Sequence, residues 1–127
     1  MKPRGVYETV VYAPELERAA AFYRDVLDLR EVEDGVFRLD RGGVLLLFDP
    51  ARSSQPGRLV PSHGVAGEGH VAFAVGPGEL DAWRERLGAH GVELEQEKDW
   101  PQGARSLYVR DPAGNSVELV EGDLWSP

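Results

Sequence analysis

Two hydrophobic periodicities alternate along this chain, and they do so twice in the same order. Each half begins with a short run of β-branched and aromatic residues, continues with apolar residues at helical spacing, and ends with three more strand-like runs. The first half predicts a strand at 6–12, a helix at 15–28, and strands at 29–33, 36–39 and 44–48. The second half predicts a strand at 70–75, a helix at 77–88, and strands at 92–95, 104–110 and 116–121. The pattern therefore predicts an α+β fold of two βαβββ modules.

Breaker residues separate these elements. Residues 49–69 are rich in Pro, Gly and Ser and lack periodicity, which is typical of a linker or of a lid over a cleft. We predict a single domain over 1–127, with modules at about 5–49 and 68–121 joined by a linker at about 50–67. Asp-Pro-Ala-Gly-Asn at 111–115 joins the last two strands. Pro112 restricts φ, and Gly114 and Asn115 tolerate positive φ, so we expect a hairpin here.

The two halves form a weak internal repeat. In the register of this repeat Glu8 matches His70, and Glu118 matches Leu46 or Leu47. Duplicated units usually pack about a pseudo-two-fold axis and share a site, so the sheets are expected to form one open, curved mixed sheet around a cleft.

Three strands each carry one ionisable side chain on the face opposite their bulkiest residues: Glu8, His70 and Glu118. If those faces line a common cavity, the three side chains form a site for one divalent ion, such as Mn²⁺, Ni²⁺, Zn²⁺, Fe²⁺ or Mg²⁺, with coordination positions left open. The alternative is that they are ordinary hydrogen-bonded or solvated residues, and for Glu8 an exposed edge-strand carboxylate.

Composition narrows the classes of function. The chain has 127 residues, 42% of them hydrophobic, which suffices for a packed core. It has no cysteine, which excludes disulfides and thiolate ligands. A net charge of −8 argues against nucleic acid, and no apolar run reaches the length of a membrane span. We therefore expect a cytoplasmic protein that binds neither nucleic acid nor membrane.

Three stretches carry a family resemblance: Ala21–Leu29, Gly69–Phe73 and Tyr108–Leu119. Together they resemble the vicinal oxygen chelate superfamily, which includes glyoxalase I, extradiol dioxygenases, fosfomycin-resistance transferases, methylmalonyl-CoA epimerase and bleomycin-resistance proteins. The resemblance implies paired βαβββ modules around a metal, commonly in a homodimer whose modules pair across chains, and a small-molecule substrate that chelates the metal.

The family pattern carries over to individual residues. It implies that Glu8, His70 and Glu118 are the metal ligands, that Glu118 is also catalytic, and that Tyr108 is catalytic and contacts substrate. This chain departs from glyoxalase I, which has a fourth ligand where Leu46 or Leu47 stands, and from dioxygenases, which have His in place of Glu8. Fosfomycin-resistance transferases carry threonine where this chain has Val10.

Other residues are candidates for substrate binding. Arg110, on the Tyr108 face, and Arg105 are candidate anchors for an anionic substrate, and Trp100, Phe48 and Trp125 are candidate walls of an apolar pocket. Each also has a packing interpretation, and His63 in the linker is expected to be a solvated loop residue.

Two classes of function follow from the sequence. The first is a divalent-metal enzyme acting as an isomerase, epimerase, lyase, transferase or dioxygenase. The second is a metal-free protein, like the bleomycin-resistance proteins, that sequesters a drug or aromatic ligand.

Overall fold

The chain forms two compact units in the computed structural model, which describes residues 1–125. The first unit is Met1–Gly67 and the second begins at Glu68. The division falls at the end of the predicted linker. That the two units act as a single domain stays a prediction, and each is described below by itself.

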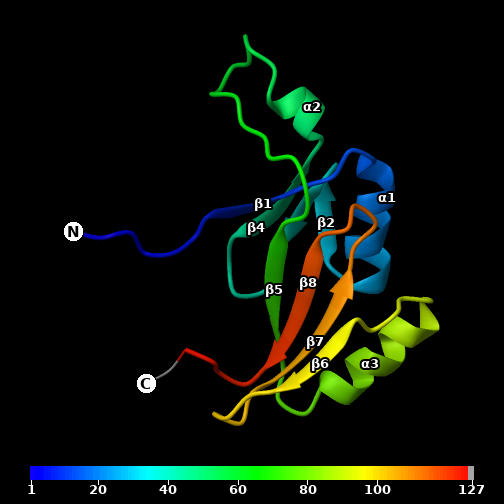
Figure 1. Cartoon of the computed structure of the whole chain (residues 1–127). Coiled ribbons are helices and arrows are strands. Elements are labelled where there is room, and N and C mark those ends of the chain that lie inside the picture. The colour runs from blue at the N-terminus through cyan, green and yellow to red at the C-terminus, as the bar shows by residue number, and fades with distance from the viewer. Residues whose placement is uncertain (126–127) are drawn as a thin grey trace. The chain divides into compact units, whose positions relative to one another are not determined.

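The first unit is a four-stranded sheet with a helical segment between its first two strands (Figure 1). Its elements are β1 (Glu8–Tyr12), α1 (Leu16–Ala21), η1 (Phe22–Val26), β2 (Arg30–Glu33), β3 (Val36–Arg38), β4 (Val44–Phe48) and α2 (Pro50–Ser53). The strand order is β1-β4-β3-β2, in which β1 and β4 are parallel and the other pairs antiparallel.

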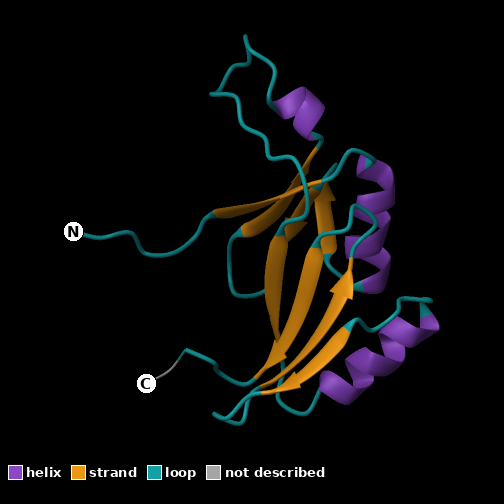
Figure 2. Cartoon of the chain, viewed as in Figure 1, coloured by secondary structure: helices purple, strands orange, loops and turns teal. Residues whose placement is uncertain are grey.

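The second unit repeats this topology. Its elements are β5 (His70–Val75), α3 (Leu80–Ala89), β6 (Gln96–Asp99), β7 (Arg105–Arg110) and β8 (Ser116–Glu121). The order is β5-β8-β7-β6, again with one parallel pair, β5 and β8, at one side. Figure 2 shows strands and helices in both units, so the predicted α+β class with two βαβββ modules is confirmed.

Each core lies between a helix and one face of its sheet. In the first unit Tyr23, Phe37 and Leu45 are fully buried. In the second unit the fully buried apolar side chains of α3, β7 and β8 are Leu80, Leu87, Leu107, Val109, Val117 and Leu119. Because strand side chains alternate, placing Val117 and Leu119 against the helix turns Glu118 to the opposite face.

The first helix differs from its predicted form, a continuous helix over 15–28. It becomes a π-helical turn after Ala21, where the Leu27 N–H donates to the Phe22 carbonyl at 3.2 Å. The wider turn keeps Phe22, Tyr23 and Val26 buried together. Hydrophobic spacing alone does not reveal one extra residue in a turn.

The strand predicted at 92–95 is wrong, because the observed strand is β6 at Gln96–Asp99. The Val92 N–H donates to the Leu87 carbonyl at 2.9 Å and so completes the end of α3, where Gly91 has a φ of 71°. Val92 therefore belongs to the helix end, and Glu95, whose N–H donates to the Tyr108 carbonyl at 2.8 Å, already lies beside β7. Pairing with β7 selects the exposed, polar residues of β6 for the strand itself.

The predicted linker contains the short helix α2. The Asp49 side chain accepts a hydrogen bond from the Ala51 N–H at 3.0 Å, and Pro50 occupies the first helical position. Asp followed by Pro is a recognisable helix-start signal, but a helix of four residues is too short to show hydrophobic periodicity. In the described part of the chain, no helix is long and apolar enough to cross a membrane.

Candidate functional site

Strand register in the second unit brings His70 and Glu118 to the same face. In the parallel pair β5 and β8, His70 lies opposite Ser116, and Ala72 lies opposite Glu118. Because alternate residues share a face, His70 and Ala72 lie on the same side as Glu118. The short Ala72 side chain leaves space in front of the carboxylate.

Glu118 is a buried carboxylate, only 6% exposed. The Ser106 hydroxyl donates a hydrogen bond of 2.6 Å to its Oε2 atom. The Trp100 indole N–H in turn donates to the Ser106 Oγ at 2.9 Å. One carboxylate oxygen is thus held by a hydroxyl that is itself held by an indole, which restricts the orientation of the carboxyl group.

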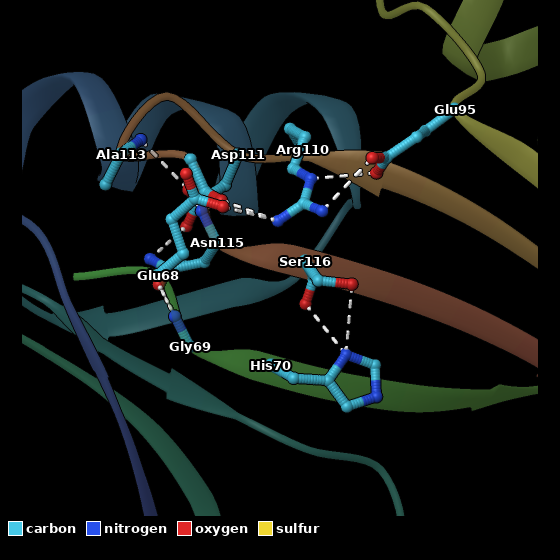
Figure 3. Close-up of polar contacts among 10 residues, drawn as sticks. Glu68, Gly69, His70, Glu95, Arg110, Asp111, Ala113, Asn115 and Ser116 are labelled. Carbon is cyan, nitrogen blue, oxygen red and sulfur yellow. Dashed lines mark hydrogen bonds and ion pairs between the residues drawn. The ribbon is translucent and has the colours of Figure 1, made fainter.

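The other carboxylate oxygen faces His70. The His70 Nε2 lies 3.3 Å from the Glu118 Oε1, and the imidazole side chain is 51% exposed. On the far side of the ring, Nδ1 lies 3.1 Å from the Ser116 carbonyl and 3.2 Å from its hydroxyl (Figure 3). With the proton on Nδ1, the ring donates to the Ser116 carbonyl and presents a lone pair at Nε2. With the proton on Nε2, Nδ1 accepts from the Ser116 hydroxyl and Nε2–H points at the Glu118 Oε1.

In the tautomer with the proton on Nδ1, two lone pairs face each other across 3.3 Å, on Nε2 and on the Glu118 Oε1. Such a contact is favourable only when a cation or a proton lies between the two atoms. An imidazole nitrogen and a carboxylate oxygen at this separation could both bind one divalent ion. The donor pair therefore fits a divalent ion.

Tyr108 lies beside this pair. It is directly opposite Glu118 in the antiparallel ladder of β7 and β8. The pKa of its hydroxyl is raised above the ordinary value by burial first, and then by the hydrogen bond to and the negative charge of Glu118. A hydrogen bond with Ser106 lowers this pKa and offsets part of the rise. The hydroxyl consequently keeps its proton at neutral pH and can donate it in a hydrogen bond.

These groups open into a cavity of about 390 Å³ formed by residues of the second unit alone. His70, Glu118 and Tyr108 supply polar groups on its wall, and Trp100 and Trp125 supply aromatic surface. This combination of apolar walls with a few polar groups is typical of sites for small molecules.

Glu8 belongs to the first unit, at the exposed start of β1. The ladders settle its place in the repeat. The residue two places after His70 pairs with Glu118, and the residue two places after Glu8 pairs with Leu46. Leu46, rather than Leu47, is therefore the counterpart of Glu118. Among residues 1–125, no three His, Asp or Glu side chains gather closely enough to hold a metal.

Two predicted substrate-binding residues have other contacts. The Arg110 guanidinium makes two hydrogen bonds to Glu95, at 2.8 and 3.1 Å, and further ones to Glu68 and the Gly114 carbonyl (Figure 3). Its donors are thus occupied within the second unit. Phe48 lies in the first unit, where its ring packs against the ring of His63 at 4.7 Å.

His63 makes specific side-chain and backbone contacts, which a solvated loop residue would lack. Its Nδ1 lies 2.6 Å from the Tyr12 hydroxyl, and its backbone N–H donates to the Ser53 carbonyl. The linker is therefore attached to the end of β1 by a side-chain hydrogen bond, which sequence spacing did not predict.

The hairpin that precedes β8 supports the site. The buried Asp111 carboxylate accepts hydrogen bonds from the N–H groups of Ala113 and Asn115, at 2.9 and 2.8 Å. The Asn115 side chain accepts one from the Gly69 N–H at 2.7 Å (Figure 3). The loop thus attaches the residue before His70 to the start of β8. Of its residues, Gly114 alone has positive φ, at 85°.

Sequence reasoning missed these supporting residues, as well as Ser106 and Ser116. The Asp at the start of a tight turn was a usable signal, because Asp side chains commonly bond to backbone N–H groups two residues on. No comparable local signal identifies Ser106, whose partners lie 6 and 12 residues away in the chain.

Comparison with known proteins agrees with the fold. Residues 5–119 match the family model of the Glyoxalase/Bleomycin resistance protein/Dioxygenase superfamily. The chain belongs to this superfamily, and the resemblance identified from the sequence is confirmed.

Individual relatives are enzymes of different kinds. MhqE of Bacillus subtilis, assigned as a ring-cleaving dioxygenase, is 30% identical over all of this chain, which spans only 46% of MhqE. The metallothiol transferase FosB of Bacillus licheniformis is 24% identical over 95% of this chain and 77% of its own length. The crystal structure of lactoylglutathione lyase from Agrobacterium tumefaciens is 41% identical, covers both chains completely and gives a TM-score of 0.88.

Proposed function

We propose that this protein is a divalent-metal-dependent enzyme acting on a small oxygenated substrate that chelates the metal. The observation that carries the proposal is the 3.3 Å approach of the His70 Nε2 to the Oε1 of buried Glu118 inside the cavity. The family supports an enzyme at this level, since relatives include a transferase and a lyase. The type of reaction is left open among isomerase, epimerase, lyase, transferase and dioxygenase.

Glu8 is the proposed third ligand. It occupies the position in β1 that His70 occupies in β5, and its carboxylate is exposed and makes no ion pair with a described residue. We further propose that the chain is a homodimer and that one divalent ion, Mn²⁺, Ni²⁺, Zn²⁺ or Fe²⁺, binds per site. Leu46 supplies no ligand atom, so no fourth protein ligand is proposed. The cytoplasmic location stays a prediction.

The residues of the second unit have separate tasks in this proposal. When bound, the ion would act as a Lewis acid on neighbouring substrate oxygens. His70 and Glu118 hold it on the cavity wall, and Ser116 keeps the His70 proton on Nδ1. Tyr108, protonated at neutral pH, donates a hydrogen bond where charge develops on the substrate. Trp100 and Trp125 contact the apolar part of the substrate.

Metal binding is the direct test. We expect wild-type protein to bind about one divalent ion per chain, and its Tm to rise on titration with Mn²⁺, Ni²⁺, Zn²⁺ or Fe²⁺. His70→Ala removes the imidazole ligand and should abolish both effects. His90→Ala, which changes an exposed histidine at the end of α3, is the matched control and should bind as wild type does.

Glu8→Ala tests the third ligand separately. If it lowers affinity while His90→Ala does not, Glu8 belongs to the site. If wild-type protein carries no metal and no ion changes its Tm, the enzyme proposal fails. Tight binding of a cationic aromatic drug that survives a chelator would then favour the metal-free binding protein, for which the two tryptophans of the cavity would supply stacking surface.

A further inference from the structure

We propose that Trp100 and Ser106 are positioning residues that fix Glu118 so that only its Oε1 atom serves as a metal ligand. The inference rests on the proposed metal site but concerns residues with no ligand atom of their own in it. It gives Trp100 a task beyond the substrate-contact role predicted from the sequence.

The direction of every hydrogen bond in this chain of contacts is fixed by chemistry. An indole N–H can only donate, so the Ser106 Oγ must be the acceptor of the 2.9 Å bond from Trp100. The hydroxyl proton of Ser106 is then donated to the Glu118 Oε2 at 2.6 Å, and the Tyr108 hydroxyl is a further neighbour of Ser106. A hydroxyl donating to a carboxylate at that distance forms a strong, charge-assisted bond.

Burial makes the arrangement rigid. Ser106 is completely buried and Glu118 is 6% exposed, so water has little access to compete for these bonds. Ser106 lies on β7 and Glu118 on the neighbouring strand β8, while Trp100 follows β6. Three consecutive segments of the sheet thus contribute one group each, and the strand register determines their spacing.

The consequence for the metal is a one-oxygen carboxylate ligand. With Oε2 bound to Ser106, Oε1 is the oxygen left to face the His70 Nε2. A carboxylate without such a restraint can rotate or bind through both oxygens. Hydrogen-bonding partners of metal ligands commonly contribute about 10- to 100-fold in metal affinity.

Zn²⁺ titration by calorimetry tests the proposal in the full-length protein. We expect Ser106→Ala to weaken Zn²⁺ binding by about 10-fold or more. Trp100→Phe retains the ring and removes only the N–H, and we expect a smaller loss. Because Trp100 acts through Ser106, adding Trp100→Phe to the Ser106→Ala variant should cause no further loss. Trp83→Phe, on α3, is the matched control.

The Trp100 indole N–H signal in nuclear magnetic resonance spectra gives a readout that needs no activity. Its shift in wild-type protein and in Trp83→Phe can be measured even if Ser106→Ala folds poorly. The three tryptophans give three such signals, and Trp100→Phe identifies the relevant one. We expect Zn²⁺ to shift this signal in wild-type protein and in Trp83→Phe, and to shift it far less in Ser106→Ala.

Two failures are distinguishable. If wild-type protein binds Zn²⁺ and both Ser106→Ala and Trp100→Phe bind it equally well, the positioning role is overturned while the metal site stands. Additive losses in the double variant would also overturn it, because Trp100 would then act independently of Ser106. If wild-type protein binds no divalent ion, the proposed function fails and the positioning role fails with it.

Discussion

At the scale of single residues, Glu118 is the most informative position, because its contact with His70 is unfavourable without a metal or a proton and favourable with one. Without a cation or a proton between the two atoms, its Oε1 faces a lone pair on the His70 Nε2. With a cation, the same two atoms become ligands. The stability of a variant that exchanges one oxygen for an amide nitrogen should therefore depend on metal.

Glu118→Gln tests this dependence. At mildly alkaline pH without metal, we expect it to raise the free energy of unfolding by up to about 1 kcal/mol, because the new amide donates to Nε2 while the remaining oxygen still accepts from Ser106. With saturating Zn²⁺ the order should reverse, since only wild-type protein gains binding energy. Chemical denaturation with and without Zn²⁺ measures both signs. A variant less stable than wild type under both conditions would contradict the metal interpretation.

At the scale of elements, Arg110 joins the end of β7 to the segment before β6 and to the residue that opens the second unit. It pairs with Glu95 and with Glu68, and its predicted contact with substrate stays a prediction. Its hydrogen bond to Glu95 holds the pKa of that carboxyl below its ordinary value of 4.5. A lowered carboxyl pKa adds stability above the ordinary value and loses it as the pH falls through the folded value.

Glu95→Gln should therefore destabilise the protein at neutral pH, and the difference from wild type should shrink as the pH falls below about 4.5. Both groups are solvent-exposed, so the effect is expected to be small and to weaken further in high salt. Urea denaturation of both proteins across this pH range measures it. Glu93→Gln is the matched control, since Glu93 is an exposed neighbour with no ion pair to a described residue. A pH-independent difference would contradict the assignment.

The same elements show what the sequence could and could not predict. Local patterns predicted the order of strands and helices, the hairpin at 111–115 and the face shared by His70 and Glu118, because side-chain alternation is a local property. The position of β6 failed because strand pairing with β7 overrode the alternation at 92–95. The Ser106 contacts to Trp100 and Glu118 could not be predicted, because these residues become neighbours only when β6, β7 and β8 pair in the sheet.

At the scale of the whole molecule, the repeat makes the two units similar in topology and different in chemistry. Where the second unit has Glu118, the first has Leu46, and where the second opens with His70, the first opens with Glu8. A complete site in our proposal therefore needs one group from a first unit and two from a second unit. The family resemblance implies modules that commonly pair across the chains of a homodimer, so these units can belong either to one chain or to two.

Mixing two inactive variants tests that arrangement. Glu8→Ala and His70→Ala each damage every site when alone. A mixed dimer contains one Glu8→Ala chain and one His70→Ala chain. If its two sites are shared across the chains, one site carries both alanines and the other has both Glu8 and His70. After subunit exchange in an equal mixture, about a quarter of the wild-type metal capacity should return. If each site lies within one chain, no capacity returns, because every chain lacks one ligand. Mixing Glu8→Ala with Glu118→Ala should restore binding in the same proportion, whereas His70→Ala with Glu118→Ala should not, since those two ligands belong to the same unit.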